Sequence, residues 1–269
     1  MPRETRHERQ RRAARLVALL ANAYPGARTA LRFRSPFELL IATILSAQCT
    51  DKKVNEVTAR LFRDYATPAA LADADPTAIE AIIRPTGFYR QKAKSIQSAA
   101  RDLTERFRGR VPALLDDLIS LRGVARKTAN VVLGNAFGIP GLAVDTHMQR
   151  VNRRLGLTRA EDPEQIERDL AALLPEREWT TFTNRVIHHG RVCCTAKRPR
   201  CESCPLAGEC PQLMISAPGK FMISAPAGGT GRANTGQGAR SSVKEARSSA
   251  KGTRRAGKGS SRSAKGPRR

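Results

Sequence analysis

Residues 113–137 read ALLDDLISLRGVARKTANVVLGNAF. Apolar side chains recur at helical spacing on both sides of a short polar break. The pattern predicts a helix that ends near Leu121, a tight connection through 123–125, and a second helix that starts near Arg126. This is a helix–hairpin–helix, and it leaves backbone N–H groups exposed at a helix N-terminus, where they suit a phosphate.

The rest of the chain also reads as helices. Ser35 before a proline is typical of a helix start, and Asp75 and Asp162 repeat the same cap-then-proline signature. No run of four to eight residues alternates as a strand does. Further helices are expected at 90–107, 126–137, 146–155, 163–173 and 178–190. The fold class predicted from these signals is all-α.

Charge points to nucleic acid as the partner. The 269 residues carry a net charge of +24, with 13 lysines and arginines against one acid in residues 215–269. Such a balance favours binding to DNA phosphates, although an inert basic surface or an anionic membrane could also explain it. The composition of 215–269 predicts a disordered basic tail. We find no signal peptide and no membrane-spanning run, so we expect a soluble, cytoplasmic protein with no membrane partner.

Four cysteines lie close together near residue 200: Cys194, Cys201, Cys204 and Cys210. A disulfide framework is typical of small secreted domains, so a metal centre is the better interpretation here. Zinc sites usually pair two separated chelating elements, whereas this single compact loop favours an iron–sulfur cubane. Lys197, Arg198 and Arg200 crowd the loop, and we expect them to face DNA phosphate.

Five motifs in order resemble the endonuclease III family of DNA glycosylases, over about residues 10–213 of this chain. They are the loop at 45–51, the loop at 86–89, the hairpin, Val-Asp-Thr-His at 144–147, and the cysteine spacing preceded by His-Gly-Arg at 189–191. The resemblance implies a [4Fe-4S] cluster on the four cysteines, with Cys194 rather than the adjacent Cys193 as the first ligand.

The resemblance also implies a two-domain glycosylase fold. Residues 1–30 and 140–213 are expected to form a helical domain that holds the cluster loop, 194–210. Residues 31–139 are expected to form a six-helix barrel that contains the hairpin.

Two residues are candidates for the chemistry. From sequence chemistry alone, Lys127 reads as a surface lysine that touches phosphate, and Asp145 reads as a helix N-cap. The resemblance implies instead that Lys127 attacks the C1′ atom of a damaged nucleotide and that Asp145 assists. Both roles of Asp145 hold together, because a carboxylate at a helix N-terminus stays ionised.

Several further residues are candidates for contacts with DNA or with the lesion. The resemblance places Gln48 in the duplex space that an extruded nucleotide leaves, and Phe88 as a wedge in the stack; a core role for Phe88 is equally compatible with the sequence. The hairpin candidates are Arg122, Gly123, Val124, Ala125 and Arg126. The lesion-pocket candidates are Ser46, Asp51 and His147.

The hairpin departs from the usual family pattern at two positions. Arg122 stands where the family usually has proline, and Ala125 stands where it usually has a second glycine. Because alanine lacks the freedom of glycine at positive φ, we expect a tighter or slightly reshaped hairpin.

The activity that the resemblance implies is that of a bifunctional DNA glycosylase and AP lyase of base-excision repair. Its partner would be double-stranded DNA that contains oxidised pyrimidines or abasic sites, bound by a monomer, nucleoid-associated if the source is bacterial. One alternative is an adenine mismatch glycosylase, but such monofunctional relatives generally lack the hairpin lysine, so Lys127 argues against it. A second alternative is a catalytically weak or silent helix–hairpin–helix DNA-binding protein.

Overall fold

Proline and a capping side chain start three helices at the predicted places. The computed structural model describes residues 4–215. In it, the side chains of Ser35, Asp75 and Asp162 each accept a hydrogen bond from a backbone N–H two or three residues further on. A proline follows each cap in the first turn, where its missing N–H has no helical partner to lose.

Helices are the only regular elements of residues 4–215, and the prediction of an all-α fold is confirmed. The α-helices are α1 (Arg6–Ala23), α2 (Pro36–Leu45), α3 (Asp51–Asp64), α4 (Pro68–Ala72), α5 (Pro76–Ile83), α6 (Tyr89–Phe107), α7 (Leu115–Ile119), α8 (Arg126–Val132), α9 (Thr146–Arg154), α10 (Pro163–Ala171) and α11 (Trp179–Val192). A π-helical turn, η2 (Leu133–Phe137), extends α8, and short 3₁₀ turns lie at Arg84–Thr86, Glu176–Glu178 and Ala207–Glu209.

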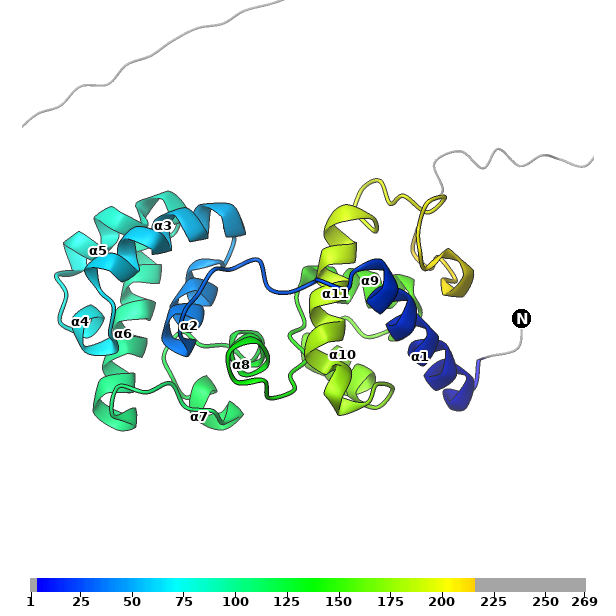
Figure 1. Ribbon diagram of the computed structural model, residues 1–269, viewed down its shortest axis with the longest axis horizontal. Coiled ribbons are helices and arrows are strands. Elements are labelled where there is room, and N and C mark those ends of the chain that lie inside the picture. The colour runs from blue at the N-terminus through cyan, green and yellow to red at the C-terminus, as the bar shows by residue number, and fades with distance from the viewer. Residues whose placement is uncertain (1–3, 216–269) are drawn as a thin grey trace, which may run out of the picture. The chain divides into compact units, whose positions relative to one another are not determined.

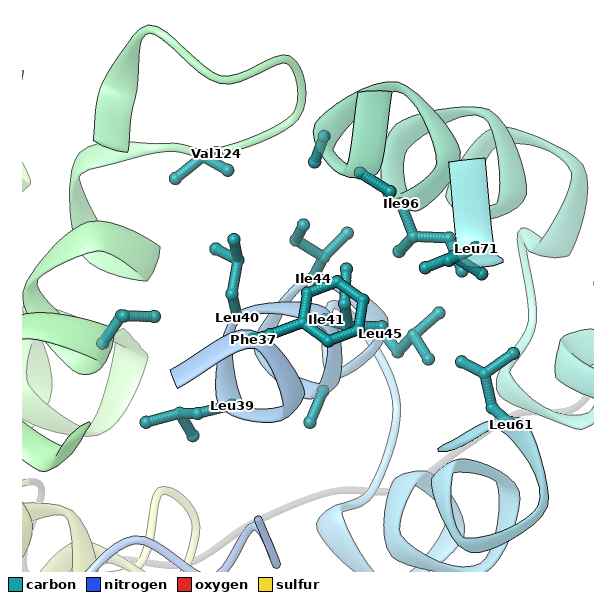
Figure 2. Packing of buried hydrophobic residues seen from close by; sticks show 14 of the residues in the cluster. Phe37, Leu39, Leu40, Ile41, Ile44, Leu45, Leu61, Leu71, Ile96 and Val124 are labelled. Atoms are coloured by element: carbon teal, nitrogen blue, oxygen red, sulfur yellow. The ribbon is translucent and has the colours of Figure 1, made fainter. Parts of the chain in front are cut away.

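The first hydrophobic core surrounds α2. Leu40 and Ile41 of this helix have no exposed surface, and every α2 residue after the initial proline is buried. A helix that is apolar on all sides is stable only when other elements enclose it. Figure 2 shows its side chains among Leu61 of α3, Leu71 of α4 and Ile96 of α6.

The second hydrophobic core joins the two ends of the described chain. Leu16 of α1, Val151 of α9, Leu170 of α10 and Phe182 of α11 are fully buried in it. Helix α1, drawn in blue, lies against α11 (Figure 1). Cysteines of the predicted cluster loop pack against this core, so the loop has a rigid support.

The two cores lie on either side of the predicted domain boundaries. The first draws almost wholly on residues 31–133, and the second draws on 13–20 and 142–206. The division into two domains stays a prediction, because the described residues form one compact unit by their contacts. Within this part of the chain no helix is long and apolar enough to cross a membrane. The predicted basic tail lies outside the described residues, apart from Ile215.

Candidate active site

Gly123 makes the left-handed turn between α7 and α8. Its φ is +83°, and a Cβ at this position would lie 2.8 Å from the Cβ of Ser95, so glycine is required. Ala125 instead has φ −83° and ψ 161°, an extended conformation that any residue adopts. The reason given for a reshaped hairpin therefore does not apply to Ala125, because the positive φ falls two residues earlier, at Gly123.

The start of α8 is open to an anion. No side chain caps this helix, and within residues 4–215 the backbone N–H groups of Arg126, Lys127 and Thr128 make no hydrogen bond. Val124 differs, because its side chain is buried and its N–H donates to the carbonyl oxygen of Leu121 at 3.1 Å. Val124 therefore anchors the hairpin in the core and does not offer its N–H to a ligand.

The two hairpin arginines differ in their surroundings. Arg126 donates from Nε and Nη2 to both carboxylate oxygens of Glu167 on α10, at 2.9 and 3.0 Å. Arg122 donates its backbone N–H to Asp102 at 3.2 Å, and its exposed guanidinium makes no ion pair with any described residue. Arg122 is therefore the arginine that remains available for a phosphate.

Lys127 and Asp145 line the same cavity, which has a volume of about 110 Å³. Asp145 is the N-cap of α9, and its Oδ1 accepts hydrogen bonds from the backbone N–H groups of His147 and Met148, both at 2.9 Å. These bonds fix the carboxylate, while Oδ2 makes no hydrogen bond within the described chain. The site thus presents an amine and one free carboxylate oxygen at a single cavity.

Ser46 and Asp51, two of the three lesion-pocket candidates, line this cavity as well. Asp51 at the start of α3 pairs with Arg191 of α11, with 2.8 Å between Oδ2 and Nη2. Since the two residues belong to elements that pack on different cores, the ion pair joins those elements at the cavity.

His147, the third candidate, does not line the cavity. Its Nδ1 lies 3.2 Å from Nη2 of Arg150, which also donates to the carbonyl oxygen of Gly190 at 2.8 Å. Burial lowers the pKa of His147, which favours the neutral ring that accepts this bond. The contact with Arg150 holds the ring outside the residues that line the cavity, and a role of His147 toward the lesion stays a prediction.

One face of α11 supplies a wall of the cavity that the sequence analysis missed. The lining residues of this helix recur at helical spacing: Thr180, Thr183, Asn184, Ile187, His188 and Arg191. Polar side chains at this spacing beside a buried apolar face were the available signal. Gly134 allows the close approach of η2, because a Cβ there would lie 2.5 Å from Oγ1 of Thr180.

Gln48 and Phe88 both have left-handed backbone conformations. Their φ values are +52° and +49°, which residues other than glycine rarely adopt. Phe88 is 70% exposed, so the alternative of a core role is wrong. Strained, exposed residues of this kind are held by their surroundings and gather at functional sites.

The four predicted metal ligands line one small cavity: Cys194, Cys201, Cys204 and Cys210. Backbone N–H groups of Leu206 and Gln212 donate to the sulfurs of Cys204 and Cys210, each at 3.4 Å. Burial raises the pKa of the Cys204 thiol to about 12. A buried thiolate here therefore needs a cationic metal centre beside it, and the donor set fits one.

His189, Cys193 and Cys204 also bring donor atoms within 4.8 Å of one another. Burial lowers the pKa of His189 to about 4 and raises that of Tyr24 to about 12, so His189 is neutral and Tyr24 keeps its proton. Tyr24 Oη lies 2.9 Å from Nδ1 of His189, and Nε2 of the same ring lies 3.8 Å from the sulfur of Cys204. The neutral ring therefore lies between Tyr24 and Cys204, with one nitrogen facing each of them.

The loop between the first two predicted ligands is basic and exposed. Lys197, Arg198 and Arg200 all have exposed side chains and no ion pair among residues 4–215. Arg154 holds the base of the loop, since its guanidinium donates to the carbonyl oxygens of Thr195 at 2.7 Å and Ala196 at 2.9 Å.

Two family models match the chain. Residues 41–176 match the HhH-GPD superfamily of base excision DNA repair proteins, and residues 194–210 match the iron–sulfur binding domain of endonuclease III. The chain is 50% identical to an endonuclease III of Synechocystis over 209 residues, which are 77% of this chain and 95% of that protein. The chain belongs to the endonuclease III family.

Other members of the family are also similar to this chain in sequence and in structure. Endonuclease III of Escherichia coli is 42% identical over 195 residues, 72% of this chain and 92% of that protein. A solved structure of a trapped endonuclease III–DNA covalent intermediate superposes with a TM-score of 0.73 at 44% identity, covering 76% of this chain and 96% of that one. A non-covalent endonuclease III–DNA complex gives 0.72 at the same identity, covering 76% and 95%.

The family settles the general activity. The predicted bifunctional DNA glycosylase and AP lyase of base-excision repair is confirmed as the activity of the endonuclease III family, to which the chain belongs. The predicted iron–sulfur centre is confirmed by the matching iron–sulfur domain, whose span covers all four cysteines of the cavity.

Proposed function

We propose that this chain removes oxidised pyrimidines from duplex DNA, with Lys127 as the nucleophile and Asp145 as the assisting carboxylate. The observation that carries the proposal is their position at one cavity, where the cap hydrogen bonds hold Asp145 and leave Oδ2 free. An amine beside a fixed carboxylate is the arrangement that Schiff-base chemistry needs.

The reaction begins with the damaged nucleotide outside the helical stack. The carboxylate of Asp145 takes a proton from the ammonium group of Lys127, which leaves a neutral amine that can attack. The amine then forms a bond to C1′ while the bond from C1′ to the base nitrogen breaks. The departing base takes up the proton that Asp145 held, and the ionised carboxylate then stabilises the positive charge on the sugar. Ring opening gives the Schiff base, and loss of a C2′ proton drives β-elimination of the 3′ phosphate.

Four thiolates hold the cluster in this proposal: Cys194, Cys201, Cys204 and Cys210. The matched iron–sulfur segment runs from Cys194 to Cys210 and leaves out Cys193, which supports Cys194 as the first ligand. When bound, the cluster neutralises the buried thiolates and cross-links the loop to the second core. None of the four ligands lines the catalytic cavity at Lys127, which supports a structural role for the cluster.

The exposed basic side chains and the exposed residues with left-handed backbone are the groups that we propose to contact DNA. The free N–H groups at the start of α8 and the guanidinium of Arg122 suit one phosphate, and the basic loop at 197–200 suits others. Exposed Gln48 and Phe88 are the side chains proposed to enter the duplex space that the extruded nucleotide leaves. Solved relatives bound to DNA support this use of the fold.

The remaining expectations fit the same proposal. The two hydrophobic cores support a barrel domain at 31–139 and a cluster domain made of 1–30 and 140–213. The cavity is complete within one chain, which supports action as a monomer. An enzyme of DNA repair works where the DNA is, so we propose a cytoplasmic protein that is nucleoid-associated if the source is bacterial.

Borohydride trapping tests the proposal. Full-length protein incubated with abasic-site duplex and sodium borohydride is expected to form a covalent adduct, because reduction fixes the Schiff base. Lys127→Ala should abolish the adduct, whereas Lys94→Ala, on an exposed lysine away from the cavity, should retain it. Tight DNA binding without any adduct would contradict the proposal and favour the silent DNA-binding alternative.

A further inference from the structure

The hydroxyl of Thr183 is buried without a hydrogen-bond partner. Thr183 lies on α11 and is 4% exposed, and its Oγ1 is one of two such buried side-chain atoms among the described residues. Buried hydroxyls in native proteins nearly always have a partner, and a helical threonine usually bonds to a carbonyl of the preceding turn. Because Thr183 lines the catalytic cavity, its hydroxyl is available to a ligand that enters there.

The adjacent Asn184 also presents unused polar groups to the cavity. The carbonyl oxygen of Val131 accepts a hydrogen bond from Nδ2 of Asn135 at 2.9 Å, and Oδ1 of Asn135 accepts one from Nδ2 of Asn184 at 3.0 Å. A carbonyl only accepts, so this chain of bonds fixes the orientation of both amides. Asn184 therefore keeps Oδ1 and one N–H free, and both asparagines line the cavity.

The π-helical turn η2 explains why Asn135 reaches this position. The turn inserts an extra residue into the helix that follows Lys127, and such insertions are frequent at functional sites. Lys127 acts on the sugar, so the base of the same nucleotide has to occupy another part of the cavity. The face of α11 at Thr183 and Asn184 lines that cavity and offers one hydroxyl, one carbonyl oxygen and one N–H.

These groups complement the pairing edge of a pyrimidine. The edge of a thymine-derived base carries an N3–H donor between two carbonyl oxygens, and enzymes that extrude bases read this edge by hydrogen bonds. We propose that Thr183 and Asn184 are base-recognition residues: the hydroxyl donates to a base carbonyl and Oδ1 of Asn184 accepts from N3–H. The inference rests on the proposed function, since it assigns the base end of the same cavity.

Thr183→Val tests the inference, because valine keeps the shape of threonine and removes only the hydroxyl. Single-turnover base release would be measured on a duplex with one thymine glycol, and strand cleavage on the same duplex with an abasic site. The abasic duplex has no base to bind, so it serves as the internal reference. The ratio of base release to abasic cleavage is expected to fall about tenfold in Thr183→Val, the loss of one hydrogen bond, and to recover in Thr183→Ser.

Thermal unfolding of the free protein separates recognition from a structural role. A buried hydroxyl without a partner is unfavourable, so Thr183→Val should unfold at the same or a higher temperature than the parent. An unchanged ratio, an equal fall of both activities, or a lower unfolding temperature would each overturn the inference. Failure of the proposed function looks different, because the parent protein itself would then form no borohydride adduct.

Discussion

Asp145 has two roles that one pair of substitutions separates. As the N-cap of α9 it accepts two backbone hydrogen bonds through Oδ1, and as a carboxylate it offers charge to the cavity through Oδ2. Asparagine is as good an N-cap as aspartate but carries no charge. Alanine has no capping group and no charge. Asp145→Asn therefore removes the chemistry and keeps the cap, and Asp145→Ala removes both.

The expected magnitudes differ enough to measure. Loss of the cap costs about 1 kcal/mol of the free energy of unfolding, and loss of the charge near the helix N-terminus costs about 0.5 kcal/mol. Asp145→Ala should thus lose about 1.5 kcal/mol, and Asp145→Asn about 0.5 kcal/mol. At about 2–4 °C per kcal/mol for a chain of this size, the unfolding temperature falls by about 3–6 °C and about 1–2 °C.

Activity should not follow stability in this pair. Removal of a positioned acid–base group lowers the single-turnover rate by about 100- to 10,000-fold, and both variants should fall by the same factor. Circular dichroism melting and base release from a thymine glycol duplex are the two assays. The reasoning is refuted if Asp145→Asn keeps most of the parental rate, because Asp145 would then act only as a cap.

Three further results are expected. Gly123→Ala should lower the free energy of unfolding in urea by at least about 1 kcal/mol, because φ is +83° and the new Cβ would lie 2.8 Å from a neighbouring side chain; an unchanged midpoint would contradict the hairpin geometry. A double-mutant cycle of Asp51→Asn and Arg191→Gln should give a coupling of about 0.5 kcal/mol that shrinks with added salt, since both side chains are partly exposed; no coupling at low salt would count against the ion pair. Deletion of residues 215–269 should flatten the salt dependence of DNA binding and leave lesion choice unchanged, because those residues are strongly basic; an unaltered salt slope would contradict this.

Features that depend on interactions between residues close in sequence, such as helix caps, could be predicted well. The caps at Ser35, Asp75 and Asp162 were predictable because a capping side chain bonds to an N–H only two or three residues away. The cap at Asp145 was predictable for the same reason. The cysteine spacing was equally informative, because four thiols in one short loop lie close enough together to bind one metal centre.

Features that depend on where helices meet were not predictable. Thr183 and Asn184 belong to the cavity only because α11 packs beside α8 and η2, and no local pattern encodes that contact. The contact of His147 with Arg150 was likewise not predictable, because it depends on how the two side chains pack on α9. The position of the left-handed residue was not predictable either: it is Gly123, close to Ser95, and not Ala125.

Helix α11 connects the cluster loop to the catalytic cavity. His188 lines the cavity, while Nε2 of the buried His189, the next residue, lies 3.8 Å from the sulfur of Cys204. The carbonyl oxygens of Gly190 and Cys194 are both held by Arg150 of α9, the helix that Asp145 caps. Loss of the cluster would remove the cross-link of the cysteine loop. The end of α11 and the contacts of the loop with Arg150 on α9 would then lose their support together. Arg150 and His189 thus connect the loop that carries the cluster ligands with α9 and α11, whereas none of the four ligands lines the catalytic cavity.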